Sequence, residues 1–195
     1  MRNFKHSVLL LVILSLLLAF VGCASAPEAE QKAAKGAMDA ALAAGADKYA
    51  VADHQAAKKL FDTAEAQVKE KKYKEAKQGY VDAKAAFEKA AVAAVAGKKA
   101  AIEEANQAVA ALEEGWKSIE ESIKKIEKKM KDQKAAWEAD AKSFVDGLKA
   151  SKEMIEADPL GAKSKVVELK TVVEKWDATF KEMAAPAKAD AKKKK

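Results

Sequence analysis

Apolar residues recur at alternating spacings of three and four through the middle of the chain. This spacing places them on one face of an α-helix and is typical of a heptad seam. Only eight Gly and three Pro occur in 195 residues, so few positions would interrupt a helix. The sequence therefore predicts an all-α fold with a long helix at its centre. The seam consists of Ile102, Ala105, Val109, Leu112, Trp116, Ile119, Ile123, Ile126 and Met130.

The seam is interrupted at Gln133 and then resumes in a shifted phase, as a stutter in a continuous helix would produce. We therefore expect one coiled-coil-like helix over residues 97–157, roughly 90 Å long at 1.5 Å per residue. Glutamates four residues before lysines support its solvent face. The resumed positions are Trp137, Ala141, Phe144, Leu148 and Ile155, and the pairs are Glu113–Lys117, Glu120–Lys124, Glu121–Lys125 and Glu127–Lys131.

A last helix is expected over residues 158–185, with Asp158 as its cap and Pro159 in its first turn. The connection is short, so this helix should run antiparallel to the second half of the long helix. We expect Phe144 and Leu148 near Leu169 and Val173, and Trp137 near Phe180. Its apolar positions are Val166, Leu169, Val173, Trp176, Phe180 and Met183.

The first half of the seam then lacks a partner. An apolar stripe of that size is rarely left in water, so either the N-terminal helices cover it or a second copy does, which would make a homo-oligomer.

The N-terminal part of the chain is rich in alanine and also predicts helices. Residues 23–34 form an expected tether containing Pro27, and residues 35–96 an expected helical hairpin or three-helix unit. Gly45 is placed to end the first helix and Asp53 to cap the next one. Gly97 marks either a break or a weak point in a continuous helix.

One hairpin within this unit combines small and aromatic residues in a recognisable order. Small residues allow two antiparallel helices to approach closely, and the tyrosines fill the space beside them. The pattern resembles a single tetratricopeptide repeat, although Gln67 and Glu88 differ from that family's preferences and such repeats need about three copies for stability. A generic alanine-packed hairpin is the expected reading, and a helix- or peptide-binding module the alternative. The pattern is Leu60, Ala64, Tyr73, Ala76, Tyr80 and Ala83.

The chain begins with a short basic segment, an apolar run and a lone cysteine. Arg2 and Lys5 precede the run from Val8 to Val21, and Cys23 follows Gly22. The run is too short to span a bilayer comfortably. This order resembles the signal peptide and lipobox of bacterial lipoproteins. The resemblance implies that residues 1–22 are removed between Gly22 and Cys23, and that fatty acids such as palmitate are attached to Cys23, where two or more chains give lasting membrane attachment.

The resemblance also implies a location. Ala24, rather than aspartate, follows the cysteine, as in lipoproteins sent to the outer membrane and facing the periplasm. In a cell with a single membrane the protein would lie on the outer face of the cytoplasmic membrane. Residues 27–95, including the stretch Ala43 to Ala50, resemble an uncharacterised family of alanine-rich helical envelope lipoproteins, which implies a fold and a location but no activity.

The excess charge lies at the C-terminus. Removal of residues 1–22 leaves 34 basic and 30 acidic residues, a net charge of +4, and residues 186–195 alone carry +4. This tail is expected to be disordered. Residues 23–185 contain equal numbers of basic and acidic residues and show no basic face with aromatic side chains. Nucleic-acid binding is therefore not expected. Lys192, Lys193, Lys194 and Lys195 are candidates for contact with anionic wall polymer, with lipid head groups or with another envelope protein.

The layout of acylated cysteine, helix and C-terminal lysine is similar to Braun's lipoprotein, whose last lysine is joined to peptidoglycan. The resemblance implies Lys195 as the residue that would form such a covalent tether here. The tail lacks that family's aromatic ending, so a loose electrostatic contact is the expected reading.

No constellation for catalysis or metal binding is evident in the sequence. His54 is expected to be solvated in the first turn of a helix, because no second ligand stands at a suitable spacing. Adjacent glutamates such as Glu103 and Glu104 point about 100° apart on a helix and do not form dyads. The three tryptophans fall on seam positions and are expected in the core. The sequence predicts a non-enzymatic envelope lipoprotein that acts as a helical spacer or scaffold, with no cofactor beyond its lipid.

Overall fold

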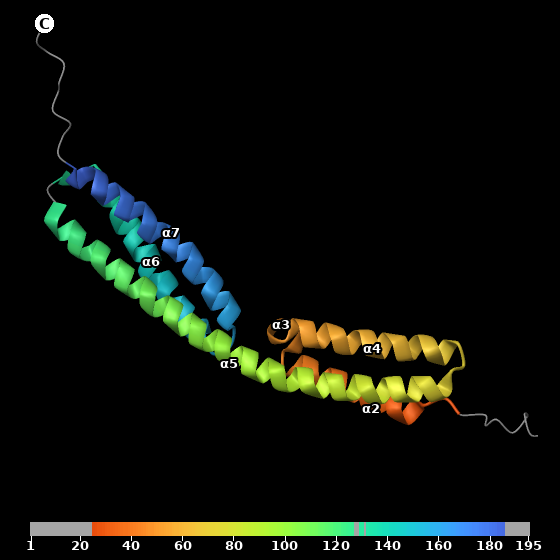
Figure 1. Ribbon diagram of the computed structural model, residues 1–195. Helices are drawn as coiled ribbons and strands as arrows, with labels where there is room; N and C mark the ends of the chain where they lie inside the picture. Colours follow the sequence, from red (N-terminus) through yellow and green to blue (C-terminus); the bar gives the residue numbers. More distant parts are fainter. Residues whose placement is uncertain (1–24, 127–128, 131, 186–195) are drawn as a thin grey trace, which may run out of the picture. The chain divides into compact units, whose positions relative to one another are not determined.

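The computed structural model describes residues 25–126, 129–130 and 132–185. Within these ranges the protein is all-helical, as predicted, and contains no strand. The chain divides into two units, unit 1 up to Val95 and unit 2 from Ala96 onwards, and the boundary falls within one long helix (Figure 1). The helices are α2 (Glu28–Ala43), α3 (Ala46–Tyr49), α4 (Val51–Lys69), α5 (Tyr73–Ile126), α6 (Lys134–Met154) and α7 (Pro159–Ala184).

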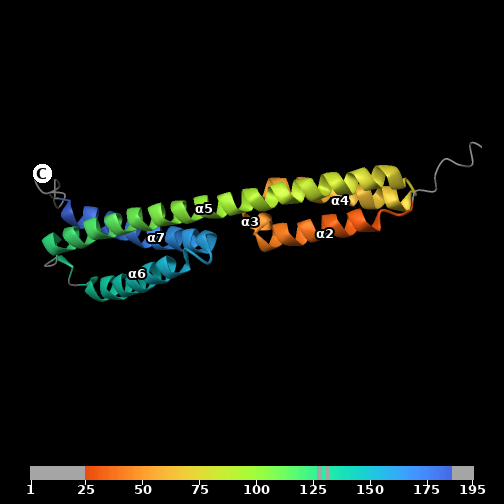
Figure 2. The same ribbon diagram turned by 90° about the horizontal axis from the view of Figure 1, so that it is seen from below.

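Unit 1 consists of α2, the short α3, α4 and the first part of α5, which lie side by side (Figure 2). Its core is made mainly of alanine, so the helices approach closely. A Cβ atom added at Gly79 of α5 would lie 3.0 Å from the Cβ atom of Ala64 of α4. Tyr80 and Phe87 of α5 are fully buried. The other fully buried positions are Ala34, Ala41, Ala46, Ala57, Ala64, Ala76, Ala83, Ala90 and Ala94.

The turn between α4 and α5 places a lysine where glycine is usual. Lys71 has φ 59°, in the left-handed region. Its N–H donates to the Val68 carbonyl oxygen at 2.9 Å, and the Lys72 N–H donates to the Gln67 carbonyl oxygen at 2.9 Å. These two bonds form a Schellman motif, which glycine normally completes because it lacks a Cβ atom. Gly45 ends α2 in the same left-handed region, as predicted, with φ 81°.

Replacement of Lys71 by glycine is expected to stabilise unit 1. The left-handed conformation costs a non-glycine residue about 1–2 kcal/mol, and the greater freedom of glycine in the unfolded chain offsets part of that gain. We expect Lys71→Gly to raise the free energy of unfolding by about 0.5–1 kcal/mol, measured by urea denaturation. Lys69→Gly, inside the last turn of α4, is the matched control and should lower it by about 1 kcal/mol. Equal destabilisation by both variants would contradict the assigned turn.

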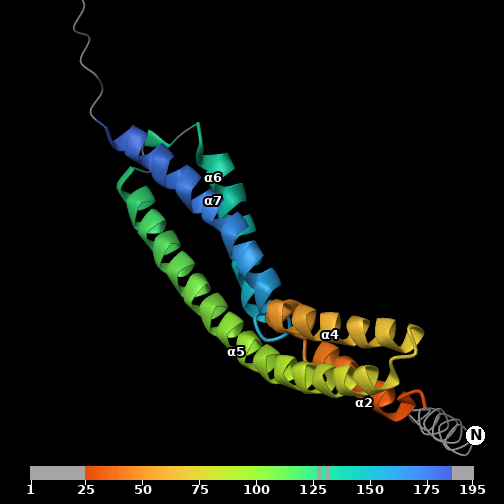
Figure 3. The same ribbon diagram turned by 45° about the vertical axis from the view of Figure 1, so that its right-hand side comes forward.

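Unit 2 is formed by the rest of α5, by α6 and by α7, which lie along one another (Figure 3). The helix expected over residues 97–157 is not continuous: α5 ends at Ile126 and α6 begins at Lys134. Helix α6 reverses direction, so that Lys152 of α6 pairs with Glu113 of α5. Helix α7 then runs parallel to α5 and pairs Lys163 with Glu104. The break at Gln133 is therefore a reversal and not a stutter.

The seam of α5 is buried inside unit 2 by α6 and α7. Neither the N-terminal helices nor a second copy is needed to cover it. Gly115 of α5 approaches the Val173 side chain of α7, and Trp137 lies 5.6 Å from Phe180 between ring centroids, as predicted. Among the predicted seam residues, Val109, Leu112, Trp116, Ile119, Ile126, Phe144, Trp176 and Phe180 are buried, and Ile123, Trp137 and Val173 are partly buried.

Several helix boundaries differ from the sequence prediction. Helix α2 begins at Glu28, so residues 28–34 belong to a helix and not to a tether. Asp53 does not cap α4, which begins at Val51; it pairs instead with Lys89 of α5 at 3.0 Å. Helix α5 passes through Gly97 without a break. Asp158 caps α7 as predicted, since its side chain accepts the Gly161 N–H at 3.1 Å.

Candidate functional site

The residues predicted to carry the lipid and the wall contact lie outside the described residues. These are Gly22 and Cys23 at the N-terminus, and Lys192, Lys193, Lys194 and Lys195 at the C-terminus. Within the part of the chain that the structure describes, no helix is both long and apolar enough to cross a membrane. In the same ranges, no group of three or more His, Cys, Asp or Glu side chains could hold a metal ion.

Lysines gather at one end of unit 2. Lys124 and Lys125 lie in the last turn of α5, and Lys134 is the first residue of α6. Between the two helices, the Lys129 ammonium donates to the Met183 carbonyl oxygen near the end of α7, at 3.1 Å. Lys129 and Met130, between α5 and α6, therefore lie near the last turn of α7. We call this part of the protein the basic end of unit 2.

A hollow of about 350 Å³ opens beside these lysines. Its wall combines apolar side chains from α5, α6 and their connection with two ammonium groups and one carboxylate. The lining residues are Ile123, Lys124, Met130, Lys134, Trp137 and Glu138.

Trp137 is held in the hollow by other aromatic rings. Its ring stacks on Trp116 of α5 at 5.0 Å between centroids, with an interplanar angle of 9°. Trp176 of α7 meets it edge-on at 5.2 Å and 87°. On its other side Trp116 stacks on Phe144 at 3.9 Å. Aromatic pairs in these geometries add about 0.5–1.5 kcal/mol beyond area burial, so this cluster fixes the hollow's wall.

Asp140 of α6 forms hydrogen bonds with two residues of α7, one of which belongs to the aromatic cluster. It accepts a hydrogen bond from the Trp176 indole N–H at 3.0 Å and another from the Lys175 ammonium at 2.7 Å. The hydrogen bond from Lys175, helped by that from Trp176, lowers the pKa of Asp140 below its ordinary value of 3.8. A lowered folded-state pKa means that this carboxylate stabilises the fold above its unfolded pKa, and that the contribution is lost as the pH falls through the folded value.

Acid should therefore destabilise the wild-type protein more than Asp140→Asn. The variant keeps a side chain of the same shape but has no charge to lose. The loss of stability that protonation of Asp140 causes in the wild type below about pH 3.8 should therefore be absent from the variant. Thermal unfolding followed by tryptophan fluorescence between pH ~5 and pH ~2.5 measures this difference. Asp146→Asn, on an exposed part of α6, is the control. Identical acid profiles for wild type and Asp140→Asn would contradict the assigned contacts.

A second polar network lies in the core of unit 1. The Tyr80 hydroxyl donates to Glu65 at 2.7 Å, and the amide nitrogen of Gln31 in α2 donates to the same carboxylate oxygen. Burial, followed by the hydrogen bond to Glu65, raises the pKa of Tyr80. This network joins α2, α4 and α5 and stabilises their packing.

His54 lies in the first turn of α4, as predicted, but it is only partly exposed. Its ring packs against Phe87 of α5 at 5.8 Å between centroids. Its Nε2 atom is buried and has no hydrogen-bond partner among the residues that the structure describes. Among those residues, no carboxylate or second histidine forms a hydrogen bond or ion pair with it.

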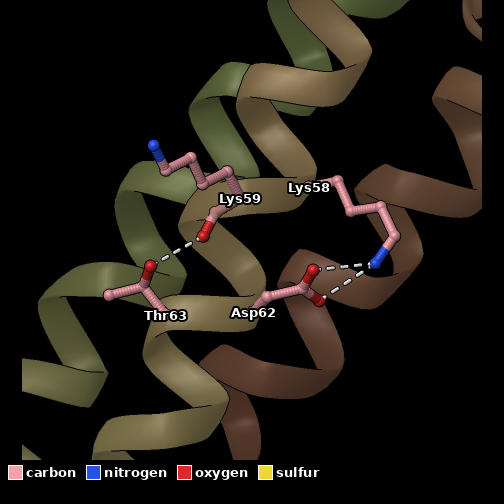
Figure 4. A network of polar contacts seen from close by, with 4 residues as sticks. All are labelled: Lys58, Lys59, Asp62 and Thr63. Carbon is pink, nitrogen blue, oxygen red and sulfur yellow. Dashed lines mark hydrogen bonds and ion pairs between the residues drawn. The ribbon is translucent and has the colours of Figure 1, made fainter.

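The exposed face of α4 carries polar contacts that stay within one helix (Figure 4). The Lys58 ammonium donates to both carboxylate oxygens of Asp62, at 2.8 and 3.1 Å. The Thr63 hydroxyl donates to the Lys59 carbonyl oxygen at 2.8 Å. Contacts between residues four apart on a helix surface contribute about 0.2–0.5 kcal/mol each. They stabilise α4.

The hairpin of α4 and α5 does not present a free groove on the face that α2 covers. Ala34, Ala37 and Ala41 of α2 belong to the same core as the alanines of the hairpin. Glu30 of α2 pairs with Lys77 of α5 at 2.9 Å. Because α2 covers the hairpin, a single repeat-like pair can be stable without neighbouring copies, and that face is not available for a partner's helix.

A second hollow, of about 500 Å³, lies between α2 and α4 in unit 1. Met38 and Phe61 line it together with Lys32, Lys35 and Glu65. The Glu65 carboxylate is already engaged by Tyr80 and Gln31. Two of the lining residues of the hollow at Trp137, Lys124 and Lys134, belong to the basic end.

Comparison with known proteins found no matching family model, no matching curated sequence and no similar solved structure.

Sequence reasoning found the members of the aromatic cluster but not the basic end. Residues 124–134 contain six lysines and only two acidic residues, and this enrichment was the available signal. The sequence pattern instead predicts glutamate–lysine pairs on the solvent face of a continuous helix. In the structure Glu113 pairs with Lys152 of α6, and Glu120 accepts the Trp116 indole N–H at 3.0 Å. Lysines 117 and 124 therefore lack the within-helix partners that the sequence predicted for them.

Proposed function

We propose that this protein is a lipid-anchored helical spacer or scaffold of the bacterial envelope. The observation that carries the proposal is the order of residues 1–23, in which a basic start and an apolar run lead to the chain's one cysteine. In this proposal Cys23 is acylated after removal of residues 1–22. The protein faces the periplasm from the outer membrane, or lies outside the cytoplasmic membrane of a cell with one membrane.

The architecture supports a structural rather than a catalytic role. Helix α5 extends through 54 residues and contributes to both units. Each unit has its own hydrophobic core. The core of unit 1 consists of alanine and aromatic residues, and the core of unit 2 consists of the seam and the aromatic cluster. Ion pairs between helices, such as Glu30–Lys77 and Asp140–Lys175, add to this packing. Away from these cores, Lys124, Lys125, Lys129 and Lys134 place positive charge at the basic end.

The lysine-rich tail gives the scaffold a second attachment point in this proposal. Contact with anionic envelope material needs only charge, and each lysine near such a surface contributes about 1 kcal/mol. Covalent attachment of Lys195 to peptidoglycan stays a prediction, which digestion of purified walls and mass analysis for a muropeptide on Lys195 can test. The coverage of the hairpin by α2 favours a scaffold over a peptide-binding module.

Replacement of Cys23 by serine is expected to release the protein from the membrane. Serine keeps the size of the side chain but cannot receive the fatty acids, and the remaining signal is too short to span a bilayer well. Fractionation of cells should find wild type in the membrane pellet and the variant either in the soluble envelope fraction or as an uncleaved precursor.

Ala24→Ser is the matched control, since it changes the neighbouring residue and keeps the thiol. It should fractionate with wild type. Persistence of mature Cys23→Ser in the membrane pellet after a salt wash would contradict lipid anchoring and point to a protein partner.

A further inference from the structure

The positive charge of the mature chain is concentrated in two segments of its sequence. Residues 124–134 and residues 181–195 each hold six lysines and two acidic residues, so together they carry +8. The mature chain as a whole carries +4, and its remainder is therefore negative by 4. The hydrogen bond from Lys129 to Met183 brings the first segment against the start of the second.

The lysines of the basic end are available to a ligand. Within the described residues, Lys124, Lys125 and Lys134 form no ion pair, whereas Lys152 and Lys163 elsewhere in unit 2 pair with glutamates of α5. Lys129 donates to a carbonyl oxygen, so its charge is not neutralised. A cluster of like charges with no ion pair among the described residues favours an anionic ligand with several charges.

The hollow beside the lysines distinguishes among anionic ligands. A hydrophilic polyanion would need the ammonium groups alone, but here Lys124 and Lys134 line the same hollow as the partly buried side chains of Ile123 and Trp137, with Glu138 as its one carboxylate. Tryptophan with flanking lysines is the combination found at the boundary between lipid head groups and acyl chains. The chemistry of this end therefore fits a phospholipid surface better than a wall glycan.

We infer that the basic end of unit 2 binds the surface of a membrane containing anionic phospholipids. The ammonium groups of Lys124, Lys125 and Lys134 contact head-group phosphates, and Trp137 lies at the depth of the glycerol region. This inference rests on the proposed function, since it gives the scaffold a second membrane contact in addition to the lipid on Cys23.

The test uses the full-length protein as cells produce it, reconstituted in phosphatidylcholine vesicles. Flotation first shows whether the protein is anchored in these vesicles. Vesicles that contain phosphatidylglycerol are then added, and vesicle clustering is followed by light scattering. The inference predicts clustering at low salt that high salt reverses. It also predicts quenching of tryptophan fluorescence when the added lipids carry bromine on their acyl chains.

Two variants with equal charge give the decisive comparison. The first replaces four lysines of the basic end by glutamine: Lys124, Lys125, Lys129 and Lys134. The control replaces four exposed lysines elsewhere in unit 2: Lys99, Lys142, Lys149 and Lys170. The protein concentration needed for clustering should rise on the order of 100-fold in the first variant and change little in the control. Circular dichroism checks that both variants are folded.

The outcomes separate the two proposals. If the protein does not float with phosphatidylcholine vesicles, anchoring fails, and direct flotation with phosphatidylglycerol vesicles still tests the basic end. Absence of binding to those vesicles in either format overturns the inference. So does an equal loss in both variants, or binding to purified cell wall without binding to the anionic vesicles.

Discussion

Trp176→Ala should be among the most destabilising single substitutions in this protein. Trp176 is 2% exposed, its ring meets Trp137 and Phe180, and its indole N–H bonds Asp140. Truncation of a buried tryptophan leaves a large cavity and costs about 3–5 kcal/mol. That is a large fraction of the free energy that stabilises a typical domain. Urea denaturation followed by tryptophan fluorescence measures the loss, since Trp116, Trp137 and Trp176 all belong to unit 2.

Two further variants show whether this effect comes from packing. Trp176→Phe should recover part of the loss, because it refills most of the cavity but not the bond to Asp140. Val167→Ala, in the same helix at a position 65% exposed, should change the free energy of unfolding by less than about 0.5 kcal/mol. A loss in Trp176→Ala no larger than in Val167→Ala would show that α7 does not cover the seam.

Ala64→Leu should have a comparable effect in unit 1, by the opposite mechanism. Ala64 is fully buried, and its Cβ atom lies against Gly79 of α5. Interiors packed to this density cannot take three more carbon atoms without separating the helices. Overpacking of this kind costs about 1–3 kcal/mol, and more where backbones are in contact. Tyrosine absorbance follows the unfolding, because Tyr49, Tyr73 and Tyr80 all belong to unit 1.

Ala66→Leu provides the comparison on the same helix. Ala66 is exposed, and leucine has nearly the helix propensity of alanine, so stability should hardly change. If Ala64→Leu were as stable as Ala66→Leu, the close approach of α4 and α5 through small residues would be wrong.

The buried faces of the helices were readable from the sequence. The spacing of Val109, Leu112 and Trp116 identified the buried side of α5, and the caps at Gly45 and Asp158 were found from residue type. The proximity of Trp137 and Phe180 followed from a short connection between antiparallel helices. Periodicity, cap residues and the length of a connection are all local features of the sequence, and these predictions needed nothing more.

The partner of each buried face was not readable in this way. The seam shows the same three-four spacing whether the next segment continues the helix or folds back on it. Residues 126–134 contain neither Gly nor Pro to mark a reversal. What favours the reversal is the stacking of Trp116 between Trp137 and Phe144, a contact between segments that no local pattern predicts. The basic end was missed for the same reason, since it forms only when α6 turns back and α7 returns.

The covered seam also changes the expectation for assembly. An exposed stripe of large side chains was the reason to expect a homo-oligomer. Because α6 and α7 bury Val109, Leu112 and Ile119 within unit 2, that reason no longer applies. In the functions proposed above, attachment to other material is made instead by Cys23, by the lysine-rich tail and by the basic end.

The mass of the native protein, purified from cell membranes, tests lipid anchoring at Cys23 most directly. We predict an N-terminal peptide that begins at Cys23 and carries fatty acyl groups, with residues 1–22 absent. A peptide with a free thiol at Cys23, or one that still contains the residues before it, would contradict the account.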